Sequence, residues 1–194
     1  MAAPHRINFC NACGKPVELR VPEGDHQQRH VCVACGTVQY RNPKTVVGCV
    51  PEWEDRILMC RRAIEPRLGK WTFPAGFLEM GETSGQGAAR ETLEEAQARV
   101  IVEDLFVAIS VPYVSQIYLV HRGRLAEPAF GPTPESSEVV LMREAEIPWE
   151  EIAFPTIWHS LKFFFADRAA GRREFHALDL TVPTRRPEQP PEPR

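Results

Sequence analysis

The sequence lacks any strong excess of charge, because 23 Lys and Arg residues stand against 26 Asp and Glu residues, a formal net charge of −3. A chain of this kind has no broad positive field for holding a nucleic-acid backbone. Any phosphate group must therefore be held locally, by metal ions or by a few arginines. Nucleic acid is not expected among the partners.

Long apolar runs are also absent. No stretch of the sequence approaches the roughly 20 apolar residues that a membrane-spanning helix requires. The first ten residues, MAAPHRINFC, lack the basic start and apolar core of a secretory signal. We therefore expect a cytoplasmic protein without a membrane partner.

The composition separates the chain into three regions. Of the 194 residues, 43% are hydrophobic and 25% charged, as in ordinary globular proteins. Residues 1–40 hold two cysteine pairs but little that could build a core, whereas residues 41–180 have the patterns of one folded domain. Residues 181–194, TVPTRRPEQPPEPR, are rich in Pro and charge, and we expect them to be disordered.

Strand-like and helix-like patterns alternate within residues 41–180. Apolar runs predict strands over 45–50, 56–62, 100–111 (with a kink), 115–125 and 139–142, and an extended segment over 70–79. Amphipathic patterns predict helices over 84–98 and 156–170. This order favours an α/β fold in which helices pack on the faces of a mixed sheet.

The two cysteine pairs have the spacing of a zinc site. Eighteen residues separate two C-x2-C pairs, and a Gly follows each pair. Four thiolates fill a tetrahedral shell and leave no position for water, so this zinc would be structural. The candidate ligands are Cys10, Cys13, Cys32 and Cys35. Two disulfides are the alternative, and His30 is either a substitute ligand or a surface residue.

The cysteine region has no basic stripe, since residues 1–40 contain four Lys or Arg and three Asp or Glu. We therefore expect a zinc ribbon that supports folding or a dimer contact rather than one that binds nucleic acid. Cys49 and Cys60 lie in apolar strands and are interpreted as small core residues.

Three carboxylates crowd one helix. Thr83 and Gln86 form the pattern of a capping box at its start. At 3.6 residues per turn, Glu91, Glu94 and Glu95 share one face. The opposite stripe, expected to pack on the sheet, consists of Ala89, Leu93, Ala96 and Val100.

The crowded acids have two explanations. In one, the helix face is solvated and carries the ion pairs Arg90–Glu94 and Arg99–Glu95. In the other, three hard oxygen ligands hold Mg2+ or Mn2+, which also bind water and phosphate oxygens. The preceding loop FPAGFLEMGE contains the glycines and carbonyl groups that such a site uses.

Six residues follow the Nudix box, the signature of hydrolases that cleave nucleoside diphosphates linked to another moiety. The spacing is G-x5-E-x7-R-E-x2-E-E, formed by Gly76, Glu82, Arg90, Glu91, Glu94 and Glu95. Further similarity lies in FCxxCG, YRNPK (40–44), WTFPAGFLE (71–79) and ARETLEEA (89–96), and it spans about residues 8–175. The chain resembles Nudix proteins with an N-terminal zinc ribbon, and among them the FAD and ADP-ribose pyrophosphatases. The resemblance implies an α/β/α sandwich with a mixed sheet after the small ribbon.

Two positions depart from the family pattern. Gln97 replaces a Gly near the end of the box, and Thr92 stands where an aliphatic residue is common. If position 97 adopts a left-handed conformation, Gln costs about 1 kcal/mol there.

The resemblance implies a mechanism for the carboxylates. Glu91, Glu94, Glu95 and the backbone carbonyl of Ala75 would hold Mg2+ or Mn2+, which bind the pyrophosphate and activate a water. Arg90 would orient these glutamates, and Glu82 would support the junction of loop and helix. Glu138 is the candidate for a further metal ligand or general base; Glu135 is second, Glu94 is the rival base, and exposed loop acids are the alternative.

The substrate follows less directly. NADH-preferring relatives carry an SQPWPFP motif that this chain lacks. Tyr113, Gln116 and Tyr118 are candidates for contacting a base, with core packing as the alternative, and His159 is interpreted as a packing residue. FAD or ADP-ribose is the expected substrate. An NADH, dinucleotide or RNA-cap pyrophosphatase and an inactive nucleotide-binding module are the alternatives, and the resemblance implies a homodimer.

Overall fold

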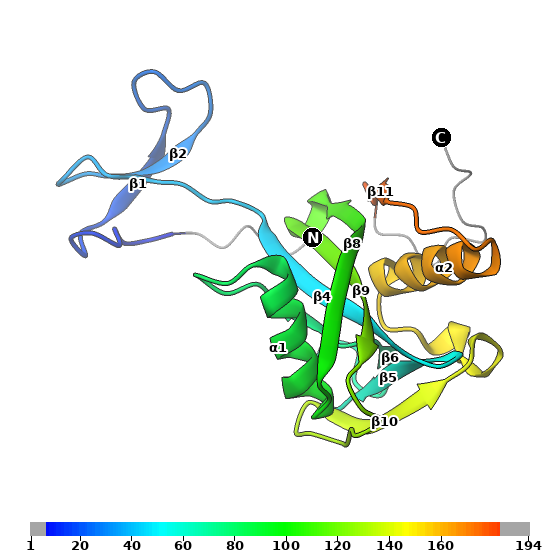
Figure 1. Ribbon diagram of the computed structural model, residues 1–194. Helices are drawn as coiled ribbons and strands as arrows, with labels where there is room; N and C mark the ends of the chain where they lie inside the picture. Colours follow the sequence, from blue (N-terminus) through cyan, green and yellow to red (C-terminus); the bar gives the residue numbers. More distant parts are fainter. Residues whose placement is uncertain (1–6, 183–194) are drawn as a thin grey trace. The chain divides into compact units, whose positions relative to one another are not determined.

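The computed structural model describes residues 7–182 (Figure 1). Most of the tail expected to be disordered, residues 183–194, lies outside this range. The chain divides into two compact units, Met1–Asn42 and Pro43–Arg194.

The N-terminal unit contains a small antiparallel sheet. Its strands are β1 (Val17–Arg20), β2 (Arg29–Cys32) and β3 (Val38–Gln39), in the order β1-β2-β3. Val17 pairs with Cys32 and Val31 pairs with Val38, so the central strand brings its cysteine into the sheet. Val31 and Cys32 are buried there.

The second unit is built on one mixed sheet. Its main path runs β10-β5-β4-β9-β8-β11, with β6 added beside β5 and β7 beside β4. The β4–β9 and β8–β11 pairs are parallel and the other pairs antiparallel. The strands are β4 (Lys44–Trp53), β5 (Arg56–Arg62), β6 (Trp71–Thr72), β7 (Ala75–Phe77), β8 (Val100–Val111), β9 (Gln116–Leu125), β10 (Ser136–Met142) and β11 (His176–Asp179).

Two helices, α1 (Ser84–Ala96) and α2 (Pro155–Ala169), lie on opposite sides of this sheet (Figure 1). On the side of α2, the sheet contributes Met59, Val107 and Val120 to the larger apolar core. On the side of α1, Leu58 and Cys60 pack with Ala96. The α/β architecture expected from the sequence is confirmed.

Several elements are additions to the expected order. Between residues 7 and 182, three short 3-10 helices occur, η1 (Pro112–Val114), η2 (Glu144–Glu146) and η3 (Trp149–Glu151). The terminal strand β11 was not predicted, because HALD is short and pairs with the distant β8. The kink predicted within 100–111 is confirmed by register shifts between β8 and β9 at Val102, Leu105 and Val107.

The predicted packing face of α1 is confirmed at Ala96 but wrong at Leu93 and Val100. Leu93 is 51% exposed, and Val100 belongs to β8 rather than to the helix. The buried face carries Gly87, Ala88, Glu91, Thr92, Glu95 and Ala96. Small residues form this face because the helix lies very close to the sheet: a Cβ on Gly87 would lie 2.8 Å from Val47 Cγ2. Two of the acids therefore point toward the protein.

Candidate metal and pyrophosphate site

The start of α1 is fixed by the predicted capping box. The Thr83 hydroxyl accepts a hydrogen bond from Gln86 N at 3.2 Å, and Gln86 Oε1 accepts one from Thr83 N at 2.8 Å. Both bonds satisfy N–H groups that have no partner within the helix. The helix thus begins at a defined residue, which sets the positions of the acids that follow.

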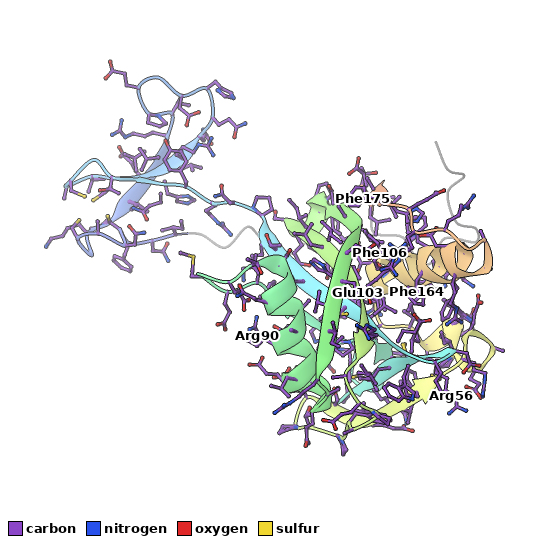
Figure 2. The ribbon with its side chains drawn as sticks, in the orientation of Figure 1. Arg56, Arg90, Glu103, Phe106, Phe164 and Phe175 are labelled. Atoms are coloured by element: carbon purple, nitrogen blue, oxygen red, sulfur yellow. The ribbon has the colours of Figure 1, made fainter. Side chains whose placement is uncertain are left out.

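Arg90, labelled on α1 in Figure 2, connects three of the four acids of the Nudix-box pattern. Its guanidinium donates to both carboxylate oxygens of Glu82 at 2.8 and 3.1 Å, to Glu91 at 2.8 Å and to Glu94 at 3.0 Å. A further bond of 3.0 Å reaches the carbonyl of Phe77. These bonds raise the pKa of Arg90, with Glu82 as the largest cause. One permanent cation therefore orients three carboxylates and the loop before them.

Glu82 braces the loop that precedes the helix. Its Oε1 accepts a hydrogen bond from Glu79 N at 2.7 Å. The bond from Arg90, followed by that from Glu79, lowers the pKa of Glu82. Glu82 is thus held as an anion within the protein, as a supporting residue should be.

Glu91 lies directly against Gly76. A Cβ added to Gly76 would come within 2.3 Å of the Glu91 carboxyl group, so the Glu91 side chain can keep this position only beside a glycine. Burial raises the pKa of Glu91, and Arg90 opposes this shift. The glycine at position 76 of the motif thus leaves the space that the Glu91 carboxyl group occupies.

Glu95 is a buried carboxylate that forms no ion pair with any residue in the described range 7–182. Only 6% of the residue is exposed, and its Oε2 accepts a hydrogen bond of 3.0 Å from Ala75 N. Burial raises its pKa to about 7, and the Ala75 bond only partly opposes this. A nearby cation would stabilise the charged form, so this acid fits a divalent metal.

Glu94 faces outward, with 58% of its side chain exposed and Arg90 as its ion-pair partner. Among the residues described, potential ligand atoms converge within 4.8 Å in two groups of three or more, neither of which contains the α1 glutamates. In this structure Glu91 and Glu94 accept hydrogen bonds from Arg90, and Glu95 accepts one from Ala75 N. A bound cation would replace some of these hydrogen bonds with bonds from the carboxylate oxygens to the metal.

The two loop acids differ in their surroundings. Glu138, in β10, forms an exposed ion pair of 3.6 Å with Arg61. The charge of Glu135, in contrast, is among the causes that raise the pKa of both Glu91 and Glu95, after burial. The charge of Glu135 therefore acts on Glu91 and Glu95, whereas Glu138 is not among the main causes of their raised pKa values.

Arg62 was missed in the sequence. Its positive charge opposes the raised pKa that burial gives to Glu95 and to Tyr118, so it lies within electrostatic reach of both. Its Nε donates to Pro66 O at 2.8 Å, and its guanidinium lies 5.3 Å from the Phe154 ring centre. The signal was the Arg pair that ends β5 just before the loop to FPAG.

The candidate base-contacting residues are divided. Tyr118 packs against the larger core, and its hydroxyl donates to Gln116 at 3.2 Å. Tyr113 is 41% exposed in η1. His159 is buried between Trp158 and Phe163, as a packing residue would be. Tyr118 therefore packs in the core, as the alternative interpretation expects, whereas the exposed ring of Tyr113 is accessible to a ligand.

The four ribbon cysteines converge as a tetrahedral site requires. The Sγ–Sγ distances are 3.5 Å for Cys13–Cys32 and Cys13–Cys35 and 3.8 Å for Cys10–Cys35. A zinc ion with bonds of about 2.3 Å sets its sulfurs about 3.8 Å apart. All four cysteines are free thiols, which excludes the disulfide alternative in this structure. Backbone N–H groups of Ala12 and Ala34 point at the sulfurs, each at 3.4 Å.

The second group of converging ligand atoms belongs to Asp167, Glu174 and His176. The positive charge beside it is the side chain of Arg122. Arg122 binds Asp167 and also donates to the Glu174 carbonyl at 3.1 Å. His176 lies 3.1 Å from Asp167 and stacks on Phe163 with ring centres 4.3 Å apart. Arg122 also lies over the ring of Phe106, 4.3 Å from its centre, and Phe106 and Phe164, both labelled in Figure 2, meet edge to face. The contacts of Asp167 with Arg122 and His176 therefore join α2, β9 and β11.

Comparison with known proteins settles the family. Residues 8–41 match the family described as "Nudix N-terminal", and residues 42–162 match "NUDIX domain". The chain belongs to the Nudix family. A NUDIX hydrolase from Nitrosomonas europaea has a crystal structure 49% identical in sequence, with a TM-score of 0.88 over 91% of this chain and 100% of that one. The resemblance stated from the sequence is thereby confirmed.

Curated Nudix relatives include NAD-capped RNA hydrolases NudC. The protein of Photobacterium profundum is 29% identical over 145 residues, 74% of this chain and 53% of the relative. That of Edwardsiella ictaluri is 33% identical over 105 residues, 54% and 38% of the two chains. The chain thus spans about half or less of the length of these relatives. It is a Nudix hydrolase, and enzymes of this family use divalent metals and act on nucleotide-derived substrates.

Within residues 7–182, neither helix combines the length and the apolar character that crossing a membrane demands.

Proposed function

We propose that this Nudix pyrophosphatase hydrolyses FAD or ADP-ribose, with Mg2+ or Mn2+ held by Glu91, Glu94, Glu95 and the Ala75 carbonyl. The observation that carries the proposal is Glu95: a buried carboxylate whose pKa is raised to about 7, beside a second buried acid, Glu91. Natural proteins seldom bury two carboxylates together unless a cation compensates them.

The bound metal ions would supply a low-pKa water and would neutralise charge on the pyrophosphate oxygens. Arg90 keeps the glutamates at fixed positions through its four carboxylate bonds, and Glu82 anchors the loop through Glu79 N. The attacking water forms a bond to one phosphorus while the bond to the bridging oxygen breaks. The products are a nucleoside monophosphate and a second phosphorylated fragment.

A base must take the proton of that water. Glu138 is paired with Arg61, and Glu94 is paired with Arg90. The charge of Glu135 is among the causes, after burial, that raise the pKa of both Glu91 and Glu95, and the Thr133 hydroxyl links Glu135 N to Glu95 O. We therefore place Glu135 ahead of Glu138 and Glu94 as general base or additional metal ligand.

The substrate assignment draws on the region beyond the metal site. Arg62, near Glu95, is a cation for the phosphate that the metals do not bind. Tyr113, with 41% of its surface exposed, offers a ring for stacking on a base, and Gln116 offers a polar contact. The ring system of FAD or the adenine of ADP-ribose suits such a surface.

The names of the NudC relatives favour a second candidate, hydrolysis of NAD or of NAD-capped RNA. The near-neutral charge of the chain counts against RNA, because a long polyanion needs several phosphate contacts. The homodimer stays a prediction from the resemblance, and sedimentation of the purified protein checks it.

The deciding experiment is a substrate panel with product identification, run with Mg2+, with Mn2+ and with EDTA. The panel contains FAD, ADP-ribose, NADH, NAD-capped RNA and diadenosine polyphosphates. Metal-dependent release of AMP from FAD or ADP-ribose supports the proposal. Preference for NAD-capped RNA assigns the second function, and nucleotide binding without turnover indicates an inactive module.

A further inference from the structure

The connection between β9 and β10 is attached to the C-terminal end of α1. A helix end leaves its last carbonyl groups without partners inside the helix. Here Gly131 N donates to Ala96 O at 2.8 Å, and the Thr133 hydroxyl donates to Glu95 O at 3.3 Å. Phe130 adds apolar contact with the core on this side of the sheet. The attachment therefore uses the end of the helix that carries Glu95.

Gln97, the residue that departs from the family pattern, takes part in this attachment. Its backbone is left-handed, with φ +53°, a conformation in which glycine is unstrained. Its side-chain amide donates to Pro132 O at 2.6 Å. A glycine would adopt this backbone conformation without strain but could not make the bond to Pro132. Gln97 thus adds some backbone strain and gains a hydrogen bond to the loop.

Thr133 carries the attachment on to Glu135. Its hydroxyl oxygen accepts hydrogen bonds from Glu135 N at 3.2 Å and Ser136 N at 3.1 Å while it donates to Glu95 O. The backbones of Thr133 and Ser136 also bond to each other, at 2.9 and 3.2 Å. One oxygen atom thus fixes the backbone of Glu135 relative to Glu95.

We propose that Gln97 and Thr133 are positioning residues that hold Glu135 against the carboxylates of α1 for the hydrolytic step. The proposal rests on the proposed function, in which Glu135 serves as base or metal ligand. The two residues act only through Glu135: neither touches substrate or metal. Their contribution is to keep that carboxylate from moving with its exposed loop.

The first test is Gln97→Gly, which restores the family residue. Because glycine suits the left-handed conformation, the melting temperature should stay the same or rise. The kcat for ADP-ribose should nevertheless fall about tenfold with KM nearly unchanged, since only the placement of Glu135 is lost. Thr133→Val should act alike, and Thr133→Ser should restore turnover. Glu127→Gln, an exposed change earlier in the same connection, is the matched control and should leave kcat unaltered.

A double-mutant cycle separates positioning from general damage. In a Glu135→Gln background, Gln97→Gly and Thr133→Val should cause no further loss, because the group that they position is already gone. An additional tenfold loss in that background would overturn the proposal. Full activity of Gln97→Gly and Thr133→Val in an otherwise active enzyme would overturn it as well.

Amide hydrogen exchange tests the attachment without turnover. In metal-free protein, Gln97→Gly should speed exchange at the amides of Glu135 and Ser136, and Glu127→Gln should not. Unchanged protection in Gln97→Gly contradicts the attachment. A wild-type protein that hydrolyses no member of the substrate panel refutes the proposed function instead, and the exchange result then stands separately.

Discussion

The carboxylate of Glu95 lies 3.0 Å from the backbone nitrogen of Ala75, which joins the buried face of α1 to the start of β7. This single bond is the nearest compensation for an acid of which 6% is exposed. The loop FPAGF is therefore joined to the helix acids, and Glu95 and the Ala75 carbonyl, both proposed as metal ligands, are neighbours before any cation binds.

Replacing Glu95 by Gln should abolish turnover while keeping the fold. The amide oxygen of Gln can still accept from Ala75 N, but a neutral group cannot hold Mg2+ or Mn2+. We expect hydrolysis of ADP-ribose to fall by more than about 100-fold, with an unchanged circular dichroism spectrum. Retention of activity in a folded variant would remove Glu95 from the metal site.

The same residue makes stability depend on pH in the metal-free protein. Its pKa rises from 4.5 to about 7 on folding, so the folded protein keeps a proton that the unfolded chain releases between these values. The free energy of unfolding should therefore decrease as pH rises through this window, by up to about 3 kcal/mol. Urea titrations of wild type and Glu95→Gln across the window measure this as their difference. Parallel curves would contradict the assigned pKa.

Gly76→Ala should damage the site through Glu91. The new Cβ would lie 2.3 Å from the Glu91 carboxyl group, so that side chain must move away from its position. We expect a loss of about 1–3 kcal/mol of stability and a large fall in kcat. Gly85→Ala is the matched control, because its Cβ meets Val102 at 3.6 Å, an ordinary contact. Equal activity of the two variants would show that Glu91 need not stay where it is.

His159 should prove dispensable for catalysis. Both ring nitrogens are buried without a hydrogen-bond partner in the described part of the chain, and burial lowers the pKa of His159 to about 4. The unfolded chain therefore gains a proton between pH 6.5 and 4 that the folded protein does not, and stability should fall as pH drops through this range. His159→Leu should remove that dependence and retain turnover. A folded but inactive His159→Leu protein would give this residue a chemical role.

The ribbon should hold one zinc ion per chain with its cysteines reduced. The protein has six free thiols, so titration after denaturation without reductant should count six. Two disulfides would leave two. Elemental analysis should find one equivalent of zinc, lost in Cys13→Ser, since a tetrahedral thiolate site needs all four ligands. Zinc-free protein with six thiols would contradict the structural zinc.

Local sequence patterns predicted most of the helices and strands. The strands at 45–50 and 56–62 and the capping box of Thr83 and Gln86 follow from short-range signals, and they appear where expected. The inward face of α1 could not be read in this way. Hydrophobicity alone placed Leu93 inward, whereas close approach to the sheet selects small residues such as Gly87 and Ala88.

Long-range relations in the site were also hidden from the sequence. The ranking of Glu138 over Glu135 rested on the sequence alone, which does not reveal that the Thr133 hydroxyl links Glu135 N to Glu95 O. Arg62 reaches the site from β5 through tertiary packing that no spacing reveals. From the sequence, Gln97 in place of the family's glycine implied only a small loss of stability. Its hydrogen-bond partner, Pro132, lies 35 residues away and could not be predicted.

The most direct test of the central claim is anomalous diffraction from crystals grown with Mn2+, compared with hydrolysis in EDTA. The account predicts a manganese peak about 2.1 Å from carboxylate oxygens of Glu91 and Glu95, and complete loss of ADP-ribose hydrolysis on chelation. Crystals with no metal peak along α1, or hydrolysis that continues unchanged in EDTA, would contradict it.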